Sequence, residues 1–141
     1  MVRTAFSHMA ISCKNPLTVE SFYVKHFGFK RARVVAPGPN QVVFLKREDI
    51  YLEIFQAKQD TPLPSAGGAG PEYPGWRHLA FTVDSVDAKL AEMGQEAHIT
   101  LGPLNFDEVI KGWRTAWIAD PEGNIVEITQ GYTDQDNLLQ Q

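Results

Sequence analysis

The sequence has one cysteine, Cys13, among 141 residues. A single thiol cannot form an internal disulfide, a Cys-x-x-Cys redox pair or a zinc knuckle, so we expect Cys13 to act only in packing. Long hydrophobic runs are also missing. No window approaches the roughly 20 apolar residues of a membrane-spanning helix, and the opening "MVRTAFSHMAIS" has no apolar stretch of signal-peptide length. We therefore expect no association with membranes and a cytoplasmic location.

The sequence also lacks clustered positive charge. The 13 lysines and arginines are scattered among 17 aspartates and glutamates, which gives a formal net charge of −4. Phosphate backbones select proteins with a basic face, so nucleic acid is not an expected partner. With 43% apolar residues, the chain can bury one substantial core or form two small modules that share one.

A short pattern of histidine, apolar residue, alanine, apolar residue and hydroxyl occurs twice. It is "SHMAIS" around His8 and "RHLAFT" around His78, 70 positions later. Each copy precedes a segment with a capping residue, apolar residues at helical spacing and a terminal glycine, which predicts a helix over 15–28 and another over 84–94. Strand-like runs follow in both halves: 41–47 and 50–56, then 115–120 and 124–131.

This repetition predicts an α+β fold of paired βαβββ modules. We expect one domain over 1–141, with module 1 at about 4–58, a Pro- and Gly-rich linker at about 59–75, and module 2 at about 76–132. The polar tail is expected to fray, although Leu138 and Leu139 could dock.

Four polar residues occupy equivalent places in the two halves: His8, Glu53, His78 and Glu127. Side chains alternate across a strand, so all four lie on the face turned away from the helices. A carboxylate within an apolar strand is costly to bury unless it is paired or binds a metal. Two imidazoles and two carboxylates suit one divalent transition metal, namely Ni, Co, Zn, Fe or Mn. Taken singly, each residue fits a structural histidine or a solvent-facing glutamate, but the joint occurrence favours a metal site.

On these motifs the chain resembles the vicinal oxygen chelate superfamily, which includes glyoxalase I, methylmalonyl-CoA epimerase, extradiol dioxygenases and the fosfomycin and bleomycin resistance proteins. The resemblance rests on "SHMAIS", "VESFYVKHFGF", "YLEIFQ", "RHLAFTVDSVDAKL" and "DPEGNIVEITQ". It implies paired modules whose curved mixed sheet surrounds a metal-binding cavity, with ligands at His8, Glu53, His78 and Glu127. It also implies a homodimer.

Within the superfamily, a His/Glu/His/Glu set is like that of bacterial glyoxalase I. This resemblance implies a lyase or isomerase that acts on a small vicinal-oxygen substrate, such as a thiol hemithioacetal, by proton transfer through a metal-bound enediolate. Glu127 would be the base and Glu53 a ligand or second base. Glyoxalase I typically has an arginine and an asparagine that contact glutathione four residues after its first two ligands, whereas this chain has Ser12 and Ala57 there.

Two other functions fit the same family. One is a resistance-type protein that binds a drug or metabolite without reaction, although sequestration does not require four metal ligands. The other is a ring-cleaving dioxygenase, which would use Fe²⁺ and an additional acid-base histidine. His98 is the spare candidate in the second half of the chain.

Overall fold

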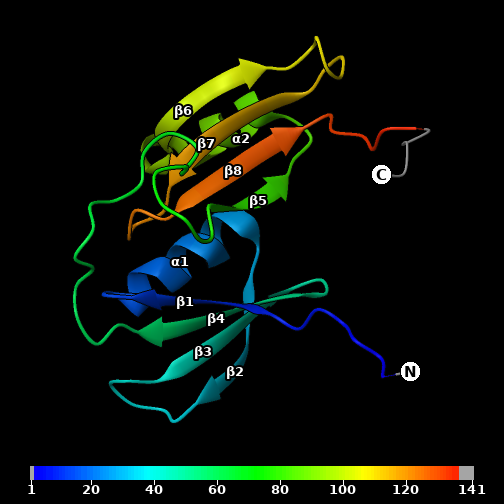
Figure 1. The fold of residues 1–141 in the computed structure, drawn as a ribbon. Helices are drawn as coiled ribbons and strands as arrows, with labels where there is room; N and C mark the ends of the chain where they lie inside the picture. The colour runs from blue at the N-terminus through cyan, green and yellow to red at the C-terminus, as the bar shows by residue number, and fades with distance from the viewer. Residues whose placement is uncertain (1, 137–141) are drawn as a thin grey trace. The chain divides into compact units, whose positions relative to one another are not determined.

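The computed structural model describes residues 2–136, which form two compact units that divide between Pro64 and Ser65. We call them unit 1 and unit 2 (Figure 1). The predicted docking of Leu138 and Leu139 lies outside the described residues. Within the part that is described, no helix combines the length and the apolar character needed to cross a bilayer.

Unit 1 is one four-stranded mixed sheet with one helix. Its elements are β1 (Met9–Cys13), α1 (Pro16–Phe27), β2 (Lys30–Val35), β3 (Val42–Arg47) and β4 (Ile50–Gln56). The strand order is β1-β4-β3-β2. Strands β1 and β4 run parallel, and the other neighbours run antiparallel.

The helix α1 begins and ends where the sequence predicts. Pro16 stands at its first position, and Gly28 ends the helix with a left-handed φ of 70°; Asn15 occupies the N-cap position, but its side chain makes no capping hydrogen bond. The apolar face packs against β1 and β4 and buries four predicted residues: Val19, Phe22, Tyr23 and Phe27. Cys13 is fully buried at the end of β1, which confirms its packing role.

Unit 2 repeats the plan. Its elements are β5 (His78–Thr82), α2 (Val86–Met93), the 3₁₀ turn η1 (Gly94–Glu96), β6 (His98–Asn105), β7 (Arg114–Ala119) and β8 (Ile125–Gln130). The order β5-β8-β7-β6, with β5 and β8 parallel, matches that of unit 1. Ser85 caps α2 by accepting a hydrogen bond from the Ala88 N–H, and the helix packs on β7 and β8.

The α+β class and the two βαβββ modules are therefore confirmed. The structure adds the fourth strand of each module, β2 and β6, which directly follows the helical segment and which the sequence pattern does not locate. Strand β2 is largely exposed and carries three cationic residues, and β6 is interrupted by Gly102 and Pro103. Apolar alternation is therefore weak in both strands.

Candidate metal centre

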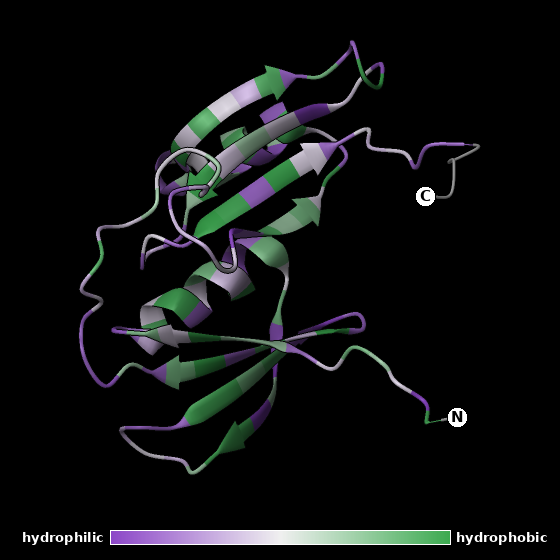
Figure 2. Ribbon diagram, viewed as in Figure 1, coloured by the Kyte–Doolittle hydropathy of each residue, from purple (hydrophilic) through white to green (hydrophobic). Residues whose placement is uncertain are grey.

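In unit 2, His78 and Glu127 meet on the sheet face turned away from α2. His78 is the first residue of β5, and Ala80, two residues later, pairs with Glu127 on β8. Residues two apart share a face, so both side chains project on the same side. His78 Nε2 lies 2.8 Å from Glu127 Oε2, and only 21% and 15% of the two side chains are exposed. Figure 2 shows a hydrophilic band between hydrophobic stretches of β8.

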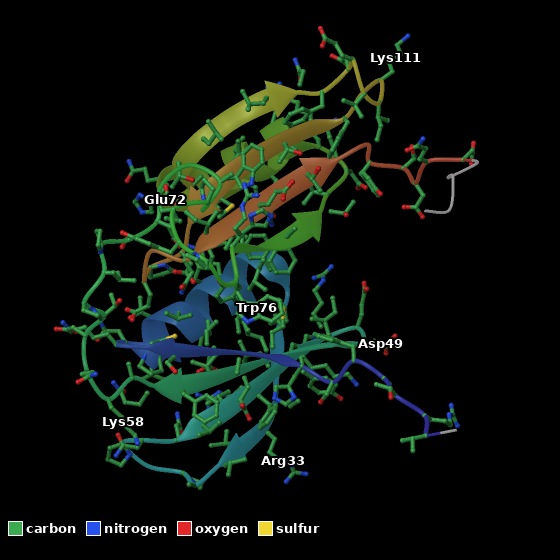
Figure 3. The ribbon with its side chains drawn as sticks, in the orientation of Figure 1. Arg33, Asp49, Lys58, Glu72, Trp76 and Lys111 are labelled. Atoms are coloured by element: carbon green, nitrogen blue, oxygen red, sulfur yellow. The ribbon has the colours of Figure 1, made fainter. Side chains whose placement is uncertain are left out.

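A short strap, Gly67–Gly70, holds the other side of the His78 ring. His78 Nδ1 lies 3.1 Å from the Ala69 carbonyl oxygen, and the Thr100 hydroxyl on β6 donates to the Gly68 carbonyl at 2.6 Å. The Gly67 N–H donates to Glu72, a residue labelled in Figure 3. Gly70 is required because its φ is +86° and a Cβ there would lie 2.8 Å from the Arg77 carbonyl oxygen.

The strap determines what His78 can bind. A carbonyl oxygen only accepts hydrogen bonds, so Nδ1 carries the hydrogen and Nε2 faces the carboxylate. If the ring is neutral, Nε2 is an acceptor and lies 2.8 Å from Glu127 Oε2, which is also an acceptor. Such a contact is favourable only if a proton or a cation lies between the two atoms. Histidines that bind metals commonly donate their other N–H to a backbone carbonyl in this way. The pair fits a divalent transition metal.

The equivalent pair in unit 1 is looser. His8 immediately precedes β1, and Ala10 pairs with Glu53 on β4. His8 Nε2 lies 3.7 Å from Glu53 Oε1, with 37% and 13% of the side chains exposed. The Ser7 hydroxyl contacts His8 Nδ1 at 2.8 Å, and a hydroxyl can donate or accept, so the tautomer of His8 is not fixed.

The structure thus brings the four predicted residues together as two pairs, one in each unit. Among the residues it describes, no three histidine, cysteine, aspartate or glutamate side chains form a cluster that could hold a metal ion. The four-ligand set stays a prediction, as do the catalytic roles of Glu53 and Glu127. His98 lies exposed on β6.

Two features of the site were not foreseen from the sequence. The Ala69 carbonyl lies in a segment without periodicity, where no side-chain pattern signals a backbone contact. Trp117, which from sequence is only one of several aromatics that could line a binding cavity, pairs across the sheet with Glu127; aligning 115–120 against 124–131 as a hairpin about the turn would have found this pairing.

Two βαβββ modules, each with a histidine at its first strand and a glutamate in its last, define the paired-module class. The chain belongs to the Glyoxalase/Bleomycin resistance protein/Dioxygenase superfamily, whose sequence profile matches residues 5–128.

Individual relatives span nearly the whole chain. The uncharacterized protein YwkD of Bacillus subtilis (strain 168) is 29% identical over 125 residues, which are 86% of this chain and 93% of YwkD. A glyoxalase family protein from Enterococcus faecalis is 31% identical with a TM-score of 0.65, and the match covers 89% of this chain and 96% of that one.

Two more distant structures share the fold. A lactoylglutathione lyase from Agrobacterium tumefaciens is 24% identical with a TM-score of 0.57, and covers 92% of this chain and 95% of its own. A mutant of the fosfomycin resistance protein FosX from Listeria monocytogenes, complexed with Mn(II) and 1S,2S-dihydroxypropylphosphonic acid, is 14% identical with a TM-score of 0.67. That match covers 93% of this chain and 95% of FosX.

Proposed function

We propose that this protein is a divalent-metal-dependent lyase or isomerase of the glyoxalase I type. The observation that carries the proposal is the His78–Glu127 contact of 2.8 Å, in which Ala69 fixes the tautomer that leaves Nε2 facing the carboxylate. The pair recurs as His8 and Glu53 in unit 1, and we propose all four residues as the metal ligands. The distant relatives with the same fold include a lactoylglutathione lyase and a protein complexed with Mn(II), which supports a test of both properties.

The donor set suits Ni, Co, Zn, Fe or Mn, because imidazole nitrogen and carboxylate oxygen are ligands that these borderline ions accept. A divalent ion bound there would act as a Lewis acid on the carbonyl oxygen of a small vicinal-oxygen substrate. Four protein ligands leave room for that substrate only if the ion is five- or six-coordinate. A thiol hemithioacetal is the leading substrate class.

The chain's own residues would carry the proton. Glu127 takes a proton from the carbon beside the carbonyl, holds it on a carboxylate oxygen, and returns it to the former carbonyl carbon, while the hydroxyl proton passes from one vicinal oxygen to the other. The net result is an isomerisation in which no proton is gained or lost. Only 15% of the Glu127 side chain is exposed, which limits exchange of the held proton with bulk water. Glu53, its counterpart in unit 1, serves as ligand or second base.

The deciding experiment measures bound transition metal by elemental analysis, on protein purified without a chelator or a histidine tag. We expect about one ion per chain, lost in His78→Ala and Glu127→Ala. His98→Ala is the matched control, because His98 lies exposed on β6, and it should keep the ion. Turnover of methylglyoxal hemithioacetals with several thiols would follow.

A protein that is isolated without metal and also fails to take up Ni²⁺, Co²⁺, Zn²⁺, Fe²⁺ or Mn²⁺ would contradict the proposal. The same fold would then be a drug- or metabolite-binding protein, and ligand screening would replace the turnover assay. The homodimer and the cytoplasmic location remain predictions, tested by solution mass and by fractionation.

A further inference from the structure

A buried hydrogen-bond donor lies beside Glu127 and takes no part in the proposed proton transfer. Trp117 is only 8% exposed, and its indole Nε1–H has no hydrogen-bond partner among the residues that the structure describes. Buried polar groups are normally paired, because an unpaired one loses its bonds to water and gains nothing in return. We therefore expect a bound molecule to supply the missing acceptor.

Trp117 lies on the face that carries the His–Glu pair. It is the direct cross-strand partner of Glu127 in the β7–β8 hairpin, and partners of this kind project on the same side of a sheet. Its neighbours Ala116 and Ile118 are fully buried on the opposite face, which α2 covers. The unpaired N–H thus belongs to the surroundings of Glu127 and not to the helix-side core.

Two residues farther along the same hairpin, a second donor is available. Trp113 Nε1–H donates to the Thr129 hydroxyl at 2.9 Å, and the Thr115 and Thr129 hydroxyls lie 2.7 Å apart. One of the two hydroxyl hydrogens makes the Thr115–Thr129 bond, whichever residue donates. Because Trp113 can only donate, the other hydroxyl hydrogen stays available for a third acceptor.

We infer that Trp117 Nε1–H binds an acceptor oxygen of the substrate, and that the spare hydroxyl hydrogen of Thr115 and Thr129 binds a second one, so that the two form a donor-only subsite. Trp117 lies directly across from Glu127, and the Thr115–Thr129 pair lies two residues away on one side of it, a backbone spacing of about 7 Å. The inference rests on the proposed function, since it assigns the subsite to the same substrate.

The subsite selects for one kind of chemistry. Donors without a facing acceptor favour an oxygen that carries no hydrogen, as in a carbonyl, an enediolate or a carboxylate, over a hydroxyl. A substrate whose oxygen gains negative charge during proton transfer would be held more tightly as that charge develops. Trp117 is accordingly a specificity-determining residue.

The test is an NMR titration of ¹⁵N-labelled protein, in which the three tryptophans give three indole N–H signals. The probes are lactate and propane-1,2-diol, which share a carbon skeleton but differ in a carboxylate against a hydroxymethyl group. Each titration is run with Zn²⁺ and without it. Trp117→Phe assigns the signal and removes the donor, and Trp76→Phe is the matched control because Trp76 is 97% exposed (Figure 3).

We expect lactate to move the Trp117 indole proton downfield to saturation, and propane-1,2-diol to move it less. Trp117→Phe should weaken lactate binding by about tenfold, whereas Trp76→Phe should not change it. An unmoved Trp117 signal, equal affinity in Trp117→Phe, or no lactate binding under either condition overturns the inference. If the protein binds none of the five metals, the proposed function fails by itself, and the metal-free titration still decides on the subsite.

Discussion

His78 Nε2 lies 2.8 Å from Glu127 Oε2, closer than the 3.7 Å that separates His8 Nε2 from Glu53 Oε1. The difference has a local cause. His78 belongs to β5, and its ring is held on the other side by the Ala69 carbonyl, whereas His8 precedes β1 and its Nδ1 contacts the adjacent Ser7. The pair in unit 2 is therefore the better preorganised half of the proposed ligand set.

The first prediction tests whether the strap orients His78, and it leaves all four proposed ligands unchanged. Gly70→Ala should destabilise the protein by about 1–3 kcal/mol more than Gly68→Ala. Both glycines have positive φ, of +86° and +52°, but only at position 70 would the new Cβ meet a backbone atom, the Arg77 carbonyl oxygen at 2.8 Å. Urea unfolding measures the difference.

The same substitution should weaken Zn²⁺ binding by about 10- to 100-fold, the usual effect of disturbing a partner of a metal-binding histidine. Gly68→Ala serves as the control, since it lies in the same strap and meets no neighbouring atom. Equal Zn²⁺ affinity in the two variants would show that the strap does not orient His78.

The two glutamates are predicted to be unequal in catalysis. Glu127→Gln should lower kcat by about 10²- to 10⁴-fold, because an amide cannot accept the substrate proton. Glu53→Gln should lower it less, since Glu53 is the ligand or second base. Both changes keep the size of the side chain, and kcat is compared at equal metal content. An equal or larger loss of kcat in Glu53→Gln would contradict the assignment of Glu127 as the principal base.

Most of the fold follows from the sequence because its signals are local. Pro16 and the terminal Gly28 define α1, and the apolar spacing identifies its buried face. The turn at Asp120 is equally local: its carboxylate accepts hydrogen bonds from the N–H groups of Glu122 and Asn124, and this turn sets the β7–β8 register. Glu127 and Glu53 stand out because each interrupts an apolar strand.

What the sequence does not predict depends on contacts between segments distant in the chain. The Ala69 carbonyl reaches His78 from a segment that resembles a plain linker, and backbone groups carry no residue signature. The unpaired Trp117 Nε1–H is likewise a matter of what surrounds it, because a tryptophan in a strand pattern is first an apolar residue. Strand alternation assigns each side chain to a face but does not give the distance between two of them.

The single cysteine allows a test of the prediction that the chain is one domain. Cys13 is fully buried in unit 1 and should react with a thiol reagent only after unfolding. Ile118→Ala in unit 2 should destabilise the protein by about 2–5 kcal/mol, because Ile118 is fully buried. If the chain unfolds as one domain, this variant will also speed the labelling of Cys13.

Ile99→Ala is the matched control, since Ile99 is 48% exposed and its truncation should leave the labelling rate nearly unchanged. Loss of stability in unit 2 by Ile118→Ala, without faster labelling of Cys13, would show that the two units unfold independently.

The last prediction concerns the thiol. Ser12 is exposed on β1 and shares a face with Ala10, next to His8, where glyoxalase I has an arginine that contacts glutathione. We expect Ser12→Arg to lower KM for the glutathione hemithioacetal by about tenfold with little change in kcat, because arginine can form a paired hydrogen bond with a carboxylate. Thr18→Arg adds the same charge on the exposed surface of α1 and controls for general attraction. An equal gain in both variants would assign the effect to net charge, and no gain in Ser12→Arg would indicate that the natural thiol is not held at this place.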